Sequence, residues 1–212
     1  MVDRMVELED TMFVGQEIGD ERIQEIEREV RRYRERVDQQ VQANGQLMIY
    51  YRMLGIRLLE REMYGPARQA LEQALEITPA NAQLHAYYAA AAAQSAKGSY
   101  DSAERSRLFR VAEQAYERAL ELDPNMRQAL YGLAVLLVFE LERPADALPH
   151  LDRLLEGQRQ HIDGRFLRAY AHVALGNQQE AVADYDAIID LTRNAEVRRQ
   201  ANRLRSQLLG ER

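Results

Sequence analysis

Four histidines and a few closely spaced carboxylates are the side chains of this chain that could hold a metal ion or move a proton. The histidines are His85, His150, His161 and His172. None of them stands at the HExxH spacing, which places two imidazoles one helical turn apart around zinc. Asp163 lies near His161, and Asp184 lies near Asp186, but side chains two positions apart on a helix do not share a face. We therefore expect surface or capping roles here, and no metal site.

The sequence also lacks the residues that nucleophilic catalysis and phosphate binding require. The chain has no cysteine, no nucleophile elbow and no glycine-rich phosphate loop. These absences predict a protein that is not an enzyme, with no catalytic residue and no cofactor.

Composition narrows the remaining classes. A net charge of −6 over 212 residues argues against binding to nucleic acid, whose phosphates attract basic surfaces. No run of about 18 apolar residues is present, so we expect no membrane span. The acidic N-terminus lacks the apolar core of a secretory signal, which predicts a cytoplasmic protein, or a periplasmic one if a leader was removed.

The chain does carry an internal pattern of small and apolar residues that recurs with a period of about 34 residues. The first copy consists of Leu54, Gly55, Leu58, Tyr64, Ala67, Leu71, Ala74 and Pro79. The second repeats its later part with Ala112, Tyr116, Ala119 and Pro124. Two weaker copies follow, at Leu133, Ala134, Leu137, Ala147, Leu151 and Leu154, and at Ala169, Gly176, Ala181, Tyr185 and Ile188.

These residues resemble the tetratricopeptide repeat family, in which each repeat is a helix–turn–helix hairpin. The resemblance implies an all-α fold, a right-handed α-solenoid of about four such repeats with an N-terminal helical extension and a C-terminal capping helix. Gly55 and Ala67 are small where two helices should cross closely, and Pro79 and Pro124 stand where a helix should end. The expected repeats are 46–80, 81–125, 126–160 and 161–192, followed by a capping helix over 193–212.

The second repeat is longer than the others. Its excess lies around residues 96–108, where Asp101 and Glu104 fit a capping box that starts a helix running to about Leu122. We expect extra turns on both helices of this hairpin, projecting as a ledge.

The N-terminal residues divide at Asp20. Residues 1–19 are poorly patterned, and a helix is expected over 20–45. Its apolar positions follow a heptad register and are Ile23, Ile26, Val30, Tyr33 and Val37. Two interpretations stay open: the helix breaks or bends near Asn44 and Gly45 and packs on the repeats, or residues 20–44 self-associate as a coiled coil.

The resemblance also implies a concave groove, lined by the first helix of each repeat. Carried over by position, its lining is Arg52, Ile56, Leu59, Ala86, Ala90, Tyr131, Val135, Val138, Phe139, Phe166, Tyr170 and Val173. This lining is largely apolar and lacks the lysines of the family's carboxylate clamp, which favours a protein or peptide partner with an apolar face.

We therefore predict a non-catalytic adaptor or scaffold for protein binding. Two alternatives remain. One is a structural homo-oligomer assembled through residues 20–44, with the groove closed by the chain's own helices. The other is a carrier of a small hydrophobic ligand.

Overall fold

The computed structural model describes residues 20–210, and every regular element in that range is an α-helix. The helices are α2 (Asp20–Glu60), α3 (Tyr64–Ile77), α4 (Ala82–Lys97), α5 (Ser102–Leu122), α6 (Arg127–Phe139), α7 (Pro144–Gly157), α8 (Ile162–Ala174), α9 (Gln178–Leu191) and α10 (Ala195–Leu209). The chain divides into two compact units, residues 1–46 and residues 47–212, and α2 begins in the first and ends in the second. The segment predicted to be poorly patterned, residues 1–19, lies outside the described residues.

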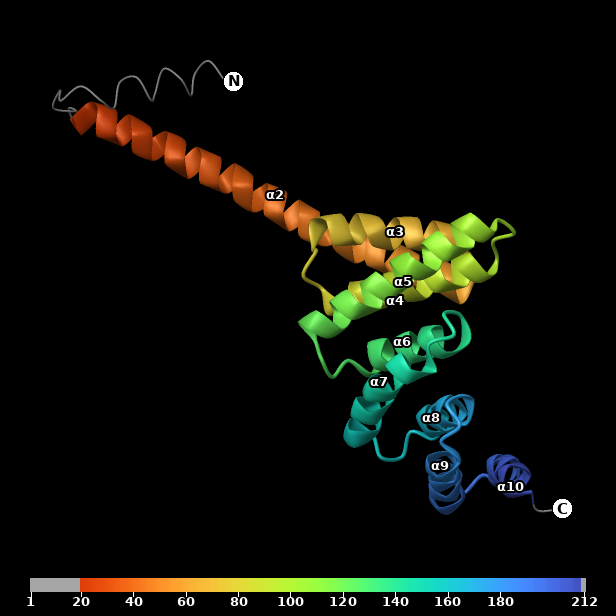
Figure 1. The fold of residues 1–212 in the computed structure, drawn as a ribbon. Helices are drawn as coiled ribbons and strands as arrows, with labels where there is room; N and C mark the ends of the chain where they lie inside the picture. Colours follow the sequence, from red (N-terminus) through yellow and green to blue (C-terminus); the bar gives the residue numbers. More distant parts are fainter. Residues whose placement is uncertain (1–19, 211–212) are drawn as a thin grey trace. The chain divides into compact units, whose positions relative to one another are not determined.

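Within the second unit, each helix packs against the next one in the chain, from α3 with α4 to α9 with α10. The first helices of successive repeats, α4, α6 and α8, also contact one another in turn. Figure 1 shows this succession of hairpins from yellow α3 to blue α10. The predicted all-α solenoid of helical hairpins, closed by a C-terminal helix, is confirmed.

Small residues allow the helices to approach closely, as the repeat pattern predicted. A Cβ atom on Gly55 would lie 2.5 Å from Cγ of Leu71, and Ala67 is completely buried beside it. On α6, a Cβ atom on Gly132 would lie 2.5 Å from the hydroxyl oxygen of Tyr116. Both contacts are closer than carbon atoms tolerate, so a larger residue would force the helices apart.

Helix ends follow the turn chemistry of the sequence. Helix α3 ends at Ile77, just before Pro79, and α5 ends at Leu122, just before Pro124. The turns inside three of the hairpins share another feature: the residue two positions before the second helix has a positive φ. These residues are Glu62 (φ 60°), Glu142 (φ 54°) and Gly176 (φ 78°).

The second hairpin is lengthened on both helices, as predicted, because α4 has 16 residues and α5 has 21. Asp101 caps α5 by accepting a hydrogen bond from the backbone N–H of Ala103 at 2.8 Å. Glu104 does not complete the expected capping box; its carboxylate instead accepts two hydrogen bonds of 2.7 Å from Arg107. That ion pair on the same helix face competes with the backbone for the carboxylate.

One of the two interpretations of the N-terminal helix placed a break or bend near Asn44 and Gly45, and α2 has no break there, since it continues through both residues. Gln40 donates a 2.9 Å hydrogen bond to the side chain of Asn44, one helical turn away. This bond keeps both polar side chains on the helix surface, where they do not compete for backbone groups. No helix within residues 20–210 is long and apolar enough to cross a membrane.

Candidate partner-binding surface

The residues predicted to line a groove fall into three groups by exposure. Phe139, Tyr170 and Val173 are exposed. The partly buried group consists of Arg52, Ile56, Leu59, Ala90, Tyr131, Val135 and Phe166. Ala86 and Val138 are buried in the core, at 0% and 6% exposure, so these two predicted groove positions are corrected.

The correction has a geometric reason. Val138 precedes the exposed Phe139 by one position, and consecutive residues on a helix point about 100° apart, which turns Val138 into the core while Phe139 stays open. Ala86 belongs to the core that α4 shares with α5 and α6, so its side chain is completely covered. A predicted helix gives the spacing of its residues, but the neighbouring helix decides which of them stay open.

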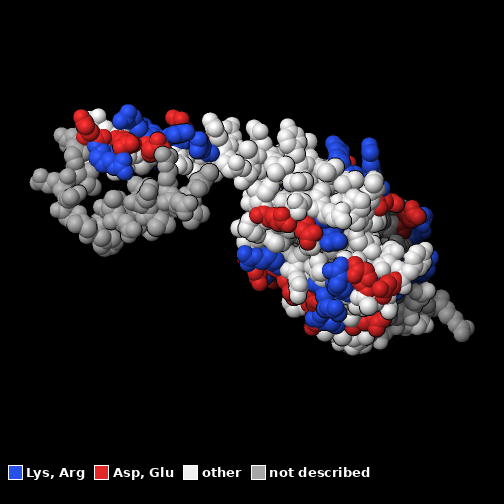
Figure 2. Space-filling view, turned by 90° about the horizontal axis from the view of Figure 1, so that it is seen from above, with Lys and Arg blue, Asp and Glu red and all other residues white. Residues whose placement is uncertain are grey.

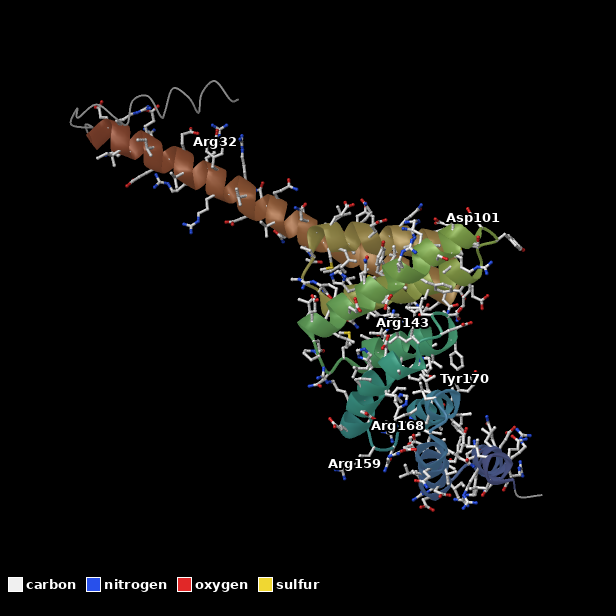
Figure 3. The ribbon with its side chains drawn as sticks, viewed as in Figure 1. Arg32, Asp101, Arg143, Arg159, Arg168 and Tyr170 are labelled. Atoms are coloured by element: carbon white, nitrogen blue, oxygen red, sulfur yellow. The ribbon has the colours of Figure 1, made fainter. Side chains whose placement is uncertain are left out.

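Phe139 and Tyr170 form the exposed part of the surface. Their rings pack with centroids 5.0 Å apart and planes inclined by 48°, and each residue is 50% exposed. Phe139 is the last residue of α6, and Tyr170 lies in the second half of α8, so the pair joins the first helices of two successive repeats. Figure 3 labels Tyr170 on α8.

Val173 extends this surface along α8. It stands three positions after Tyr170, which places it on the same helix face, and it is 40% exposed. A polar rim lies beside Phe139, because Lys97 at the end of α4 forms a 2.9 Å ion pair with Glu140. An apolar centre with a charged rim is the usual composition of a protein-binding patch. We call Phe139, Tyr170 and Val173 the aromatic patch.

The other two predicted aromatic residues have partners inside the fold. Tyr131 packs against the ring of His161, with centroids 5.4 Å apart, and Phe166 packs against Tyr185 at 6.2 Å. Phe166 also lies against the core formed by α8, α9 and α10. These contacts hold α6 to the start of α8 and α8 to α9, so they support the patch more than they extend it.

The N-terminal part of the predicted groove is different in character. Leu59 packs against the small core around Leu71 and Ala74, and Ile56 and Arg52 are half-buried on the same helix. The alanines of α4 offer little side-chain area for a partner. The exposed apolar area of the predicted lining is therefore concentrated on α6 and α8.

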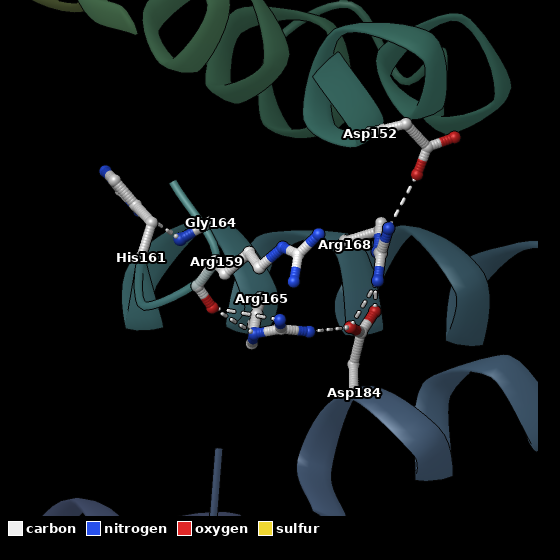
Figure 4. A network of polar contacts seen from close by, with 7 residues as sticks. All are labelled: Asp152, Arg159, His161, Gly164, Arg165, Arg168 and Asp184. Carbon is white, nitrogen blue, oxygen red and sulfur yellow. Dashed lines mark hydrogen bonds and ion pairs between the residues drawn. The ribbon is translucent and has the colours of Figure 1, made fainter. Parts of the chain in front are cut away.

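One residue with a large structural role escaped the sequence analysis. Asp184 on α9 was expected at the surface, but it is only 2% exposed and accepts hydrogen bonds from Arg168 at 2.7 and 2.9 Å. Figure 4 shows this network, in which Arg165 also reaches Asp184 at 3.4 Å. The signal was present: Asp184 stands three positions after Ala181 and next to Tyr185, on the apolar face of α9.

The electrostatics of this network are structural. The hydrogen bond to Asp184 raises the pKa of Arg168 further above its usual range, so the guanidinium keeps its charge. Arg168 also donates a 2.6 Å hydrogen bond to Asp152 on α7. A permanently charged arginine does not exchange protons at physiological pH, so Arg168 offers no acid–base chemistry. The network instead joins the three helices α7, α8 and α9.

The remaining candidates for chemistry have ordinary structural roles. His161 caps α8, as expected, with its Nδ1 accepting a 2.9 Å hydrogen bond from the backbone N–H of Gly164. Asp186 pairs with Arg205 on α10 at 2.6 Å. Within the described part of the chain, no three His, Cys, Asp or Glu side chains gather in a way that could hold a metal ion.

Comparisons with known proteins agree with this architecture. The family model described as "Tetratricopeptide repeat" matches residues 101–155 and 136–196. A DnaJ homolog subfamily C member 7 homolog from Schizosaccharomyces pombe is 32% identical over 104 residues, which are 47% of this chain and 22% of that protein. The chain thus spans about a fifth of the length of this relative.

Two other proteins match over more of their length. A TPR repeat-containing protein from Borreliella burgdorferi is 22% identical over 159 residues, covering 75% of this chain and 69% of that protein. The solved structure of YrrB, described as a TPR protein with an unusual peptide-binding site, superposes with a TM-score of 0.60 at 20% identity, covering 85% of each chain. The family match identifies tetratricopeptide repeats over residues 101–196, and the fold is that of solved tetratricopeptide repeat proteins.

Proposed function

We propose that the chain is a non-catalytic adaptor that binds a protein partner through an apolar helix or peptide docked on the aromatic patch. Tetratricopeptide repeats mediate protein–protein interaction, and here we assign that role to Phe139, Tyr170 and Val173 on α6 and α8. The observation that carries it is the exposed contact between Phe139 and Tyr170, whose rings pack together while half of each residue stays open.

The chemistry of the patch supports an apolar partner. Two aromatic rings and a valine provide dispersion and hydrophobic contact, and aromatic residues contribute most of the binding energy in many interfaces. The rings are already held against each other, so a partner would immobilise few side chains on binding. Spacing of Tyr170 and Val173 by one helical turn suits the side chains of a partner helix.

Charged residues border the aromatic patch, which sets a second requirement for the partner. Lys97 and Glu140 beside Phe139 are partly exposed and paired with each other. A partner with a short polar or charged flank next to its apolar residues would fit this rim without leaving either charge buried alone.

The test compares two tyrosines that differ in position and not in chemistry. Tyr170→Ala removes a ring of the patch, and Tyr100→Ala removes a fully exposed ring at the tip of the second hairpin. A library of amphipathic helical peptides is selected against the wild-type chain, and the dissociation constant of a selected peptide is measured for each variant by fluorescence anisotropy.

We expect Tyr170→Ala and Phe139→Ala each to weaken peptide binding by at least about tenfold, with Tyr100→Ala within about twofold of wild type. Thermal unfolding followed by circular dichroism should be nearly unchanged in all three variants, because each ring is at least half exposed. Selected peptides that bind Tyr170→Ala and Phe139→Ala as tightly as wild type would contradict the proposal.

A further inference from the structure

The first unit carries an exposed apolar stripe along α2. Ile23, Ile26, Val30, Tyr33 and Val37 are spaced alternately by three and four residues and are 41–59% exposed. Five large apolar side chains in one line leave a helix with an open seam, and a seam of this spacing is the one that two supercoiled helices bury between them. The helix is continuous over the whole stripe.

We propose that residues 22–44 of two copies of this chain form a parallel, in-register, two-stranded coiled coil. In heptad notation, Ile23, Val30 and Val37 occupy position a, and Ile26 and Tyr33 occupy position d. Position d carries no leucine here, so the apolar layers do not by themselves set the number of strands; the polar Asn44 at position a selects two strands and a single register. The occupant of the exposed stripe is therefore a second copy of the same stripe.

Charges beside the seam are complementary between two copies. In a parallel pair, position g of one helix lies next to position e of the following heptad on the other. Arg22 at g then meets Glu27 of the partner, and Glu29 at g meets Arg34. Each pair brings opposite signs together, and two-fold symmetry makes each pair twice.

The contacts that these charges make within α2 are solvent-exposed and exchangeable: Arg22 pairs with Glu25 at 2.6 Å, with both side chains more than half exposed. Within α2, Glu27 lies 3.7 Å from Arg31 and Glu29 lies 3.6 Å from Arg32, at the long end for an ion pair. The side chains involved are 52–64% exposed, so both contacts are well solvated and weak. Figure 2 shows acidic and basic side chains interspersed along this part of α2.

The polar residues of the seam fix the orientation. Antiparallel helices can also match these charges, but one such register places Ile23 against Gln40 and leaves Asn44 beyond the seam. In the parallel arrangement each layer pairs a residue with itself, so Gln40 meets Gln40 and Asn44 meets Asn44. An asparagine at position a selects register and a two-stranded state in parallel coiled coils.

The coiled-coil stripe and the aromatic patch share no residue. The proposed coiled coil uses residues 22–44 in the first unit, whereas the patch lies on α6 and α8 in the second. Failure of peptide binding leaves the coiled coil intact, and failure of dimerisation leaves the patch intact.

The first experiment measures the mass of the full chain by light scattering from about 1 to 100 μM. We expect the mass to approach that of two copies of the 24.5 kDa chain. Val30→Asp places a charge in the seam and should return the mass to one copy. Gln24→Asp adds the same charge on the other side of the helix and should leave the dimer in place. A monomer throughout, a trimer, or a dimer insensitive to Val30→Asp would overturn the proposal.

The second experiment determines the relative orientation of the two helices by disulfide cross-linking. The chain has no native cysteine, so only the introduced thiols can form a disulfide. Ile23→Cys and Gln40→Cys variants are oxidised separately, and their reduced forms are also mixed and then oxidised together. Parallel in-register helices place each new thiol against its own copy, so each variant alone should form a disulfide-linked dimer. Cross-linking that occurs only in the mixture would show antiparallel helices and refute the proposed arrangement.

A charge exchange tests the register. Glu27→Arg sets two arginines against each other across the parallel seam, which should raise the dissociation constant by about threefold to tenfold. Combining it with Arg22→Glu restores opposite charges and should recover the wild-type value. In an antiparallel pair Glu27 would face Arg34 instead, so absence of recovery in the double variant would argue against the parallel register.

Discussion

Arg168 on α8 donates two hydrogen bonds to Asp184 on α9, one to each carboxylate oxygen, at 2.7 and 2.9 Å. Nη1 of the same guanidinium donates a 2.6 Å hydrogen bond to Asp152 on α7. One side chain therefore connects the second helix of the third repeat with both helices of the fourth. Arg168 stands on α8, the helix that also carries Tyr170 and Val173.

Removing Asp184 should be costly. Asp184→Ala removes the buried carboxylate that accepts hydrogen bonds from Arg168 and Arg165. Both guanidinium groups then lose an acceptor where water reaches them poorly, and we expect the free energy of unfolding to fall by about 3 kcal/mol. Asp186→Ala is the matched control, since its carboxylate pairs with Arg205 but its side chain is 49% exposed. That change should cost less than about 1 kcal/mol. Urea denaturation of the two variants gives the comparison, and equal losses would disprove the special role of Asp184.

Gly132 should not accept a methyl group. Gly132→Ala would place Cβ 2.5 Å from the Tyr116 hydroxyl oxygen, on a ring that is itself buried, and should destabilise the chain by about 1–3 kcal/mol. Gly157, the last residue of α7, has nothing within 4 Å of the corresponding Cβ position. Gly157→Ala should therefore be neutral or slightly stabilising. The two unfolding midpoints decide the matter, and a neutral Gly132→Ala would mean that α5 and α6 separate easily.

The positive φ angles in the hairpin turns predict opposite effects of opposite substitutions. Glu142 adopts φ 54°, which strains a residue with a Cβ atom, so Glu142→Gly should stabilise by about 0.5–1 kcal/mol. Gly176 adopts φ 78° in the equivalent turn, and Gly176→Ala should destabilise by about 1 kcal/mol. Thermal melting of both variants checks the pair of signs; two shifts in the same direction would be inconsistent with this account.

Two leucines of the first repeat should differ widely in importance. The repeat pattern places both Leu54 and Leu71 in the apolar stripe, but Leu54 is 50% exposed and Leu71 is completely buried. Leu71→Ala should cost about 2–5 kcal/mol, because it leaves a cavity between tightly packed helices. Leu54→Ala should cost less than about 1 kcal/mol. Denaturant titrations that give similar losses for both would contradict this difference in packing.

Stability should also depend on His150. Burial, with a further contribution from Arg153, lowers the pKa of His150 below its usual value. The folded state then binds a proton less readily than the unfolded state, so this histidine costs stability once the pH falls below about 6.5 and costs nothing well above it. Unfolding free energies measured between pH 8 and pH 5 should decline less steeply for His150→Gln than for wild type. Parallel profiles would rule out this contribution.

The sequence by itself determined the repeating architecture. Small residues at Gly55 and Ala67 and helix-ending prolines at Pro79 and Pro124 act over one or two helical turns, so local spacing was enough to read them. The same locality revealed the cap at Asp101 and the heptad stripe of α2. Each of these features depends on neighbours in the chain, and the physics that favours them is present in the isolated segment.

Tertiary structure decided which side chains stay open and which pairs meet. Val138 is buried and Phe139 exposed because α6 is covered on one side by α7 and by the helices before it, and Phe139 meets Tyr170 only because two repeats stack. Packing of α8 against α9 brings Arg168 next to Asp184. The resulting ion pair offsets the free-energy cost of burying the charge of Asp184. Such contacts join residues that are distant in sequence, so their geometry depends on how whole helices pack and not on any local pattern.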